Sequence, residues 1–270
     1  MSLCIAKNRL YTHSLLETPF QLHAMILKLY RGVRTDLAHM TTFLSHLSSS
    51  IGYDLQLSTL KDSAISDKSI SHWFLNLSPS EEDMVFFYYS GHGRYDMKRK
   101  RWPVIYLAER SSLAGVAIIR YARTLNAKSC FLLFDCCNQR NLIGTRVLRP
   151  CCFDTKNTQP VPYQGLKKLF LSTNGLLIAA AASPHEVASF ISSQKGSQFT
   201  SFLLDTIYTH CNQDNPEWDS IFQKTRTLCA EAKRPHHPFY RIETCYFNPT
   251  KLHEPSGQSS PLSSSPILSN

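Results

Sequence analysis

Residues 84–93 read MVFFYYSGHG, and residues 131–138 read FLLFDCCN. Each segment is an unbroken apolar run that ends abruptly at polar residues, as a strand does when helices cover both of its faces. Parallel strands bring such ends to one edge of a sheet, and open α/β folds place their chemistry at that edge. The two segments therefore predict a parallel sheet with a site at its carboxyl edge.

The polar ends of these segments carry a histidine and two cysteines. His92 stands between two glycines, and Cys136 and Cys137 follow the acidic residue Asp135. A thiol and an imidazole at one sheet edge can form a nucleophile and its base. Successive side chains of a strand point to opposite faces, so Cys136 and Cys137 are predicted to face different sides. A buried structural cysteine and a loop histidine are the simpler alternatives.

Length and composition predict a folded globular protein without a nucleic-acid or membrane partner. The chain has 270 residues, of which 43% are hydrophobic, enough for one large or two small domains. The formal charge of +9 is compatible with acidic partners, but the only tight basic run is KRKR at residues 98–101. A solvated basic loop explains that run, so nucleic acid is not an expected partner. The longest apolar stretch is too short to span a bilayer, so no membrane partner is expected either.

Cysteine usage predicts a reducing compartment. Nine cysteines are present, an odd number, and four of them form adjacent pairs. No secretory signal precedes them, so a cytoplasmic location is expected, with export without a signal left open. The chain has no CxxC spacing, so no structural zinc site is expected.

Apolar periodicity and turn residues predict strands that alternate with helices, which makes the class α/β. A helix capped by Asp67 or Ser69 is expected to end before Pro79. Residues 138–168 are predicted to form a long basic surface loop, and residues 256–270 a disordered tail. The other expected helices are residues 21–30, 35–47, 113–125, 197–210 and 218–231. The expected strands are residues 3–6, 53–57, 84–89, 104–107, 130–135, 176–182 and 244–247.

SGHG at residues 90–93 and D-x-C at residues 135–137, in this order, resemble the caspase-like cysteine peptidases. The likeness is to the metacaspase and bacterial caspase-homologue branch and spans roughly residues 2–248. It includes the early Gly32-x-x-x-Asp36 pattern and the segment GSQFTSFLL that begins at Gly196. The resemblance implies a caspase-like fold, a mostly parallel sheet with helices on both faces.

The same resemblance implies a domain organisation for the whole chain. Residues 1–250 would form one peptidase domain, followed by a tail at residues 251–270. Within the domain, residues 1–140 are similar to a large subunit, residues 141–170 to a linker, and residues 171–250 to a small subunit. Cleavage of the basic linker by the enzyme itself and an uncut linker are both open.

The catalytic residues follow from the resemblance. It implies that Cys137 is the nucleophile and that His92 is its base and the acid for the leaving amine. The backbone N–H groups of Gly93 and Cys137 would bind the oxyanion. The resemblance requires no third catalytic residue, no metal and no cofactor. The chain also lacks the acidic cluster of calcium-activated members, so no calcium requirement is expected.

The substrate preference also follows from the resemblance. It implies that Asp36 and Asp135 line a pocket for Arg or Lys on the acyl side of the scissile bond, with Ser90 at its floor. The expected partners are therefore proteins or peptides with a basic residue at the cleavage site. Taken without the resemblance, Asp36 is a carboxylate at a helix N-terminus.

One segment departs from the family pattern. The family continues D-x-C with His-Ser-Gly, whereas this chain has Asn138, Gln139 and Arg140. Bulky polar residues beside the nucleophile favour a second interpretation, a catalytically impaired member that acts as an adaptor or regulator of other peptidases. The intact pair of Cys137 and His92 favours the peptidase.

Overall fold

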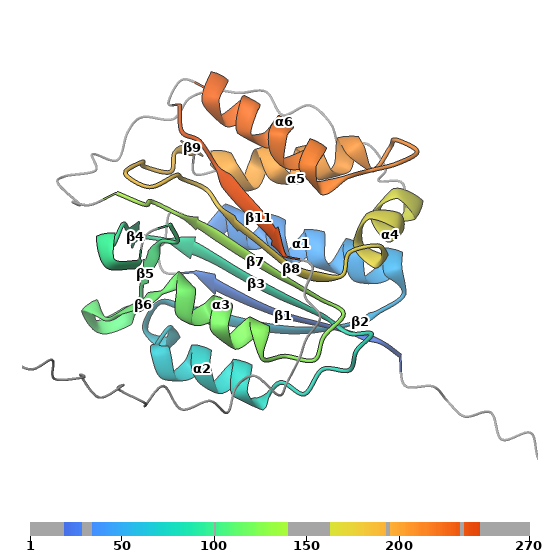
Figure 1. Ribbon diagram of the computed structural model, residues 1–270, viewed down its shortest axis with the longest axis horizontal. Coiled ribbons are helices and arrows are strands. Elements are labelled where there is room, and N and C mark those ends of the chain that lie inside the picture. The colour runs from blue at the N-terminus through green and yellow to red at the C-terminus, as the bar shows by residue number, and fades with distance from the viewer. Residues whose placement is uncertain are drawn as a thin grey trace, which may run out of the picture.

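A six-stranded sheet forms the centre of the fold in the computed structural model, which describes residues 19–28, 34–99, 101–139, 163–192, 195–232 and 235–243 (Figure 1). Five strands are parallel to their neighbours, and the sixth pairs antiparallel at one edge. The predicted parallel sheet is confirmed. From one edge to the other the strands are β11 (Phe239–Glu243), β8 (Gly175–Ala180), β7 (Ser129–Cys136), β3 (Met84–Gly91), β1 (Gln21–Lys28) and β2 (Asp54–Lys61).

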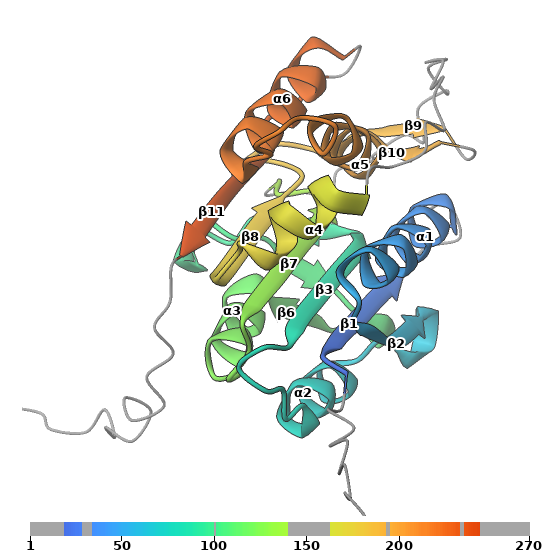
Figure 2. The same cartoon turned by 90° about the vertical axis from the view of Figure 1, so that its right-hand side faces the viewer.

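Helices cover both faces of this sheet, as Figures 1 and 2 show. Side chains of three helices, together with two from the last helix, belong to the core on one face, and those of two others to the core on the opposite face. The first group is α1 (Arg34–Ile51), α4 (Tyr163–Leu171) and α5 (Gln198–His210); the second is α2 (Asp67–Asn76) and α3 (Gly115–Arg123). The last helix, α6 (Trp218–Glu231), packs against α5 and β11.

Strand β3 explains why the deciding segment is apolar without interruption. Phe86 and Tyr88 pack into the core beneath α1 and α5, and the alternate residues Phe87 and Tyr89 into the core beneath α2 and α3. Both sets are fully or almost fully buried. The pleat divides one apolar run between two cores, and the same parity places every second residue of β3 on the side of α1 and α5.

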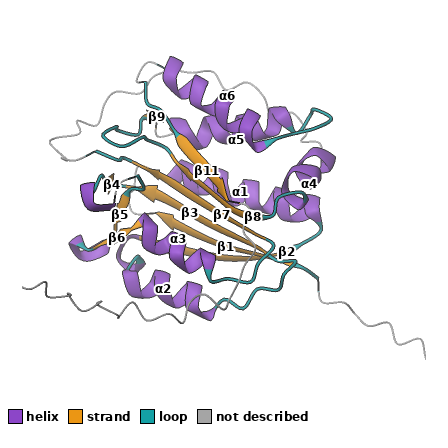
Figure 3. Cartoon of the chain, viewed as in Figure 1, coloured by secondary structure: helices purple, strands orange, loops and turns teal. Residues whose placement is uncertain are grey.

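Short strands lie near the carboxyl ends of the long ones. One small sheet pairs β4 (Gly93–Arg94), β5 (Val104–Tyr106) and β6 (Ser112–Ala114), and Figure 3 shows it beside the end of β3. A second ribbon joins β9 (Phe190–Ser192) to β10 (Gly196–Ser197) immediately before α5. Single 3₁₀ turns occupy Asp62–Ala64, Met97–Arg99 and Ala108–Arg110.

The expected helix at residues 21–30 is wrong, because this segment forms strand β1. Its apolar residues match helical spacing, but the buried residues follow one another along the chain. They are Leu22, Ala24, Met25, Ile26 and Leu27. A central parallel strand must be apolar on both faces, so its pattern contains the helical spacing within it. Pairing with β2 and β3 on both sides decides the structure.

Several other boundaries need correction. Helix α2 is capped by Ser66, whose side chain accepts from the Ser69 N–H while Ser69 bonds back to the Ser66 N–H, a capping box rather than a cap at Asp67 or Ser69. The predicted long loop ends earlier than expected, because α4 begins at Tyr163. The last described strand is β11, and the strand expected at residues 244–247 lies outside the described residues.

The remaining predicted helices and strands are confirmed with shifts at their ends, including α1, α3, α5, α6, β2, β5, β7 and β8. The strand expected at residues 3–6 and the tail at residues 256–270 lie outside the described residues. Within the described ranges, none of the helices has the length and apolarity that a bilayer crossing requires.

Candidate active site

The two predicted strand ends lie side by side. Strands β3 and β7 are adjacent and parallel, and Gly91 stands opposite Cys136 in their register. A Cβ atom placed on Gly93 would come within 2.6 Å of both the Cys136 Sγ and the Cys137 carbonyl oxygen. Only glycine permits this close approach. The fold therefore brings the histidine loop and the cysteine loop to one edge of the sheet.

The backbone of His92 is held from two directions. Its carbonyl oxygen accepts a hydrogen bond of 2.7 Å from the Tyr89 hydroxyl and one of 3.0 Å from the Tyr106 N–H. Partial burial of the ring lowers the pKa of His92 below its usual value. The imidazole is therefore neutral at pH 7 and available as a base.

Cys137 is partly exposed, whereas Cys136 is buried in the core beneath α2 and α3. The predicted difference between the two cysteines is confirmed. Burial raises the pKa of Cys137, against a weak contact of 4.0 Å from its Sγ to the Ala188 carbonyl oxygen. Reactive cysteines usually have a lowered pKa, and the direction at Cys137 is the opposite. The resting group is a thiol, so attack requires transfer of its proton to a base.

The three predicted pocket residues converge on the side of the sheet that faces α1 and α5. Asp36 lies in the first turn of α1, and the Ser90 hydroxyl donates to its Oδ2 at 3.2 Å. The Ser197 N–H donates to Asp36 Oδ1 at 2.7 Å, while the Ser197 hydroxyl donates to Asp135. Ser197 therefore joins the two carboxylates, which come from segments far apart in the sequence.

Asp135 is surrounded by hydroxyl groups. The Thr200 hydroxyl donates to its Oδ2 at 2.5 Å, and the Tyr88 hydroxyl lies 3.4 Å from the same oxygen. Burial raises the pKa of Asp135, although these hydrogen bonds oppose the shift. Burial, reinforced by the charge of Asp135, also raises the pKa of Asp36, to about 8. At pH 7 the two acids therefore hold a proton between them.

The two carboxylates lack a cationic partner in the part of the chain that the structure describes. Among the described residues, no Lys, Arg or His forms an ion pair with Asp36 or Asp135. Both side chains are nearly inaccessible, with Asp36 0% and Asp135 4% exposed. Gly196, at φ 77°, lies so close that a Cβ atom would meet Asp36 Oδ1. The described residues thus form a buried acidic pair with no counter-ion among them.

Asn138, the first residue that departs from the family pattern, does not enter this pocket. Its side chain is completely buried, and its Nδ2 donates to the carbonyl oxygens of Arg101 at 3.0 Å and Ala182 at 3.3 Å. Asn138 therefore ties the loop after Cys137 to its neighbours. Arg140 lies outside the described residues.

Sequence reasoning missed three residues that complete the pocket: Tyr88, Ser197 and Thr200. Ser197 and Thr200 carry a readable signal, since Ser-x-x-Thr before an apolar helix is an N-cap pattern, and the Thr200 N–H does bond to the Ser197 hydroxyl. Tyr88 carries a weaker one, a hydroxyl two residues before Ser90 on the same strand face.

The described residues contain no group of three or more His, Cys, Asp or Glu side chains close enough to hold a metal ion. Two basic residues of the predicted linker, Lys167 and Lys168, lie in helix α4 instead of a loop. Lys168 is also bonded to the Asp214 carbonyl oxygen and to Asn215. A helix is a poor substrate for a peptidase, which needs an extended segment.

Comparison with known proteins agrees with this fold. A family model described as the caspase domain matches residues 27–254. The chain belongs to the caspase domain family, a family of cysteine peptidases. A search of curated proteins finds no match.

Two solved structures are similar in fold. Caspase-1 from Spodoptera frugiperda aligns with 11% identity and a TM-score of 0.51, over 83% of this chain and 88% of that one. Protein GSU0716 from Geobacter sulfurreducens aligns with 11% identity and a TM-score of 0.51, over 84% of this chain and 94% of that one. At this identity the likeness concerns the fold.

Proposed function

We propose that this chain is a cysteine endopeptidase that cleaves peptide bonds after Arg or Lys. The observation that carries the proposal is the buried pair of Asp36 and Asp135 beside Cys137, two carboxylates with no cation among the described residues. Buried charges are stable only when they are paired. A substrate guanidinium or ammonium group would supply the missing charge.

The hydroxyl groups that now satisfy the acids define how a substrate would bind. A guanidinium has five N–H donors in a planar fork and can bond two carboxylates at once. It would replace the donors from Ser197 and Ser90 and favour the ionised state of both acids. An aspartate side chain would meet a like charge and could not neutralise it, so cleavage after Asp is disfavoured.

The proposed reaction uses the neutral thiol and imidazole of the resting state. Cys137 Sγ attacks the scissile carbonyl carbon while its proton passes to His92, and the Gly93 and Cys137 N–H groups receive the developing oxyanion. His92 then protonates the leaving amine, which leaves an acyl group on Cys137. Water, deprotonated by His92, hydrolyses that thioester and restores the thiol.

Hydrolysis of fluorogenic peptides that end in Arg, Lys or Asp tests the proposal, under reducing conditions with and without calcium. We expect turnover after Arg and Lys that is lost in Cys137→Ala and His92→Ala and kept in Cys136→Ala. Turnover after Asp would contradict the pocket assignment. If folded protein turns over none of the peptides, the proposed peptidase activity is contradicted.

The alternative is a catalytically impaired member that regulates other peptidases. One observation favours it: burial raises the pKa of Cys137, which leaves little thiolate at pH 7. A binding experiment distinguishes the two functions. A regulator would bind a related peptidase and would not cleave peptides itself, whereas the proposed enzyme cleaves peptides without such a partner.

Self-processing is a separate part of the proposal, because the pocket preference matches the basic linker. Cleavage after Lys167 or Lys168 is not expected, since both lie in α4. Intact mass after incubation, with Cys137→Ala as control, decides whether any cut occurs. A mass that stays unchanged in both proteins would contradict self-processing.

A further inference from the structure

The loop that follows strand β8 holds the residue immediately after the nucleophile. The Asn138 N–H donates to the Glu186 carbonyl oxygen at 2.9 Å, and the Asn138 carbonyl oxygen accepts from the His185 N–H at 2.7 Å. The Ala188 carbonyl oxygen contacts the Cys137 thiol. One short segment therefore determines where the main chain of Cys137 and Asn138 lies.

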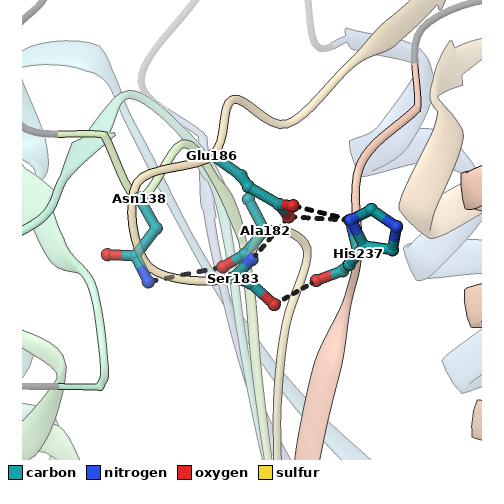
Figure 4. Close-up of polar contacts among 5 residues, drawn as sticks. All are labelled: Asn138, Ala182, Ser183, Glu186 and His237. Carbon is teal, nitrogen blue, oxygen red and sulfur yellow. Dashed lines mark hydrogen bonds and ion pairs between the residues drawn. The ribbon is translucent and has the colours of Figure 1, made fainter.

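This loop is itself fastened by a carboxylate. Glu186 Oε1 lies 2.6 Å from His237 Nδ1, and Glu186 Oε2 accepts from the backbone N–H groups of His237 at 2.8 Å and Ser183 at 3.2 Å (Figure 4). The Ser183 hydroxyl donates to the His237 carbonyl oxygen at 2.7 Å. The segment that enters β11 is thus bonded to the loop through both its side chain and its backbone.

The charge state of Glu186 suits a side chain that accepts the hydrogen bonds fastening this loop. Burial alone would raise the pKa of Glu186, but the hydrogen bonds and charge of His237, with the Ser183 N–H, lower it overall. The carboxylate is therefore ionised at neutral pH and accepts all three bonds.

The loop conformation also needs an external restraint. His185 has a φ of 75°, in the left-handed region that non-glycine residues rarely adopt. Such a residue persists only when its surroundings fix it. His185 lies between Ser183 and Glu186, the two anchored residues, and supplies the N–H that reaches Asn138. The anchor therefore maintains the strained residue that contacts the nucleophile loop.

We propose that Glu186 is a positioning residue, which acts through His237, Ser183 and Asn138 to hold Cys137 in its reactive position. The inference rests on the proposed function and adds to it the part of the molecule that orients the nucleophile. Glu186 and His237 are 30% and 44% exposed in their side chains, and such pairs contribute little to overall stability. Their removal should therefore affect turnover more than folding.

Kinetics with a peptide that ends in Arg test the inference on the full chain. Glu186→Ala should lower kcat by roughly ten- to a hundredfold, because small displacements of a reacting group have effects of that size, with KM changed less than twofold. His237→Asn, which keeps a side-chain N–H donor, should retain most of the activity that His237→Ala loses.

The matched control is Glu82→Gln, which removes the ion pair of 3.1 Å to Lys128 at the opposite, amino end of the strands. It should leave kcat unchanged and alter the melting temperature by about as much as Glu186→Ala does. Equal kcat values for Glu186→Ala and Glu82→Gln would overturn the inference.

A second readout does not depend on peptidase activity. Alkylation of Cys137 by iodoacetamide, followed by mass spectrometry of its peptide, should be at least several times faster in Glu186→Ala, because loosening the loop exposes a thiol that the loop now partly covers. The buried Cys130 and Cys229 should stay unreactive. An unchanged Cys137 rate, or a parallel increase at Cys130 and Cys229, would overturn positioning. If the wild type turns over no peptide, the proposed function fails, and this measurement still decides the role of Glu186.

Discussion

Two acidic groups flank the nucleophile, and they are built in opposite ways. Asp36 and Asp135 are buried without a cation among the described residues, and burial raises the pKa of both. Glu186 is half-buried beside His237, and the hydrogen bonds from His237 lower its pKa against the effect of burial. Glu186 thus has its partner within the protein, whereas Asp36 and Asp135 have no cation among the described residues, and in our proposal a substrate supplies it.

The largest expected effect comes from neutralising one acid of the pocket. Asp135→Asn keeps the size of the side chain but removes a charge that the bound Arg or Lys would need. We expect kcat/KM for peptides that end in Arg to fall by roughly a hundredfold or more. Glu186→Gln should lower kcat much less and leave KM nearly unchanged. A similar loss of substrate affinity in both variants would contradict the difference between the pocket acids and Glu186.

The pH dependence of ligand binding should show the same difference. Because the pKa of Asp36 is about 8 without ligand, a cationic ligand must displace a proton below that pH. Binding of an Arg-ended peptide to Cys137→Ala should therefore tighten from pH 6 to pH 8 by up to about tenfold per pH unit, the limit for one displaced proton. Isothermal titration calorimetry measures both the affinity and the proton release. An affinity that is independent of pH would contradict a protonated pocket.

Asp36 should make the folded state less stable as the pH rises, whereas it should make the binding of a cationic ligand tighter. Its folded pKa lies above the unfolded value of 3.8, so between pH 4 and pH 8 the folded state retains a proton that the unfolded chain has lost. Stability therefore decreases as the pH rises through this range. At pH 8 we expect Asp36→Asn to be more stable by at least about 1.4 kcal/mol, or about 3–6 °C in melting temperature. At pH 4 the two proteins should melt alike; a less stable variant at pH 8 would contradict the account.

The smallest change in stability is expected for Glu186→Gln, and it is a loss where Asp36→Asn gives a gain. Its folded pKa is lowered, so its contribution is present above the unfolded value of 4.5 and is lost as the pH falls through the folded pKa. Glu186→Gln should be less stable at pH 7 by at most about 1 kcal/mol, typical of a partly exposed ion pair. The difference should be smaller at pH 3. Thermal denaturation at both pH values checks this, and a variant more stable than wild type at pH 7 would refute it.

The sequence was most informative where one physical requirement dominates. Strands β3 and β7 are apolar throughout and end in residues of clear chemistry, so their neighbourhood and the different burial of Cys136 and Cys137 were predictable. Strand β1 was mistaken for a helix because a strand buried on both faces contains helical spacing. Only its partners on both sides distinguish the two.

The site was predictable in its charged residues and not in its hydrogen bonds. Asp36, Ser90 and Asp135 were identified and do converge, whereas the bridging role of Ser197 depends on the start of α5 lying above β7. The contact of Glu186 with His237 joins residues 51 apart and has no local signal. The direction of the Cys137 pKa shift likewise depends on burial, which only the folded chain determines.

Covalent labelling tests the central claim most directly, because one experiment identifies both the nucleophile and the pocket preference. Peptidyl acyloxymethyl ketones that end in Arg or in Asp would be incubated with wild type, Cys137→Ala and Asp135→Asn, and the modified residue located by mass spectrometry. The account predicts fast labelling of Cys137 by the Arg reagent, slow labelling by the Asp reagent, and loss of the difference in Asp135→Asn. Faster labelling by the Asp reagent, or modification of another cysteine, would contradict it.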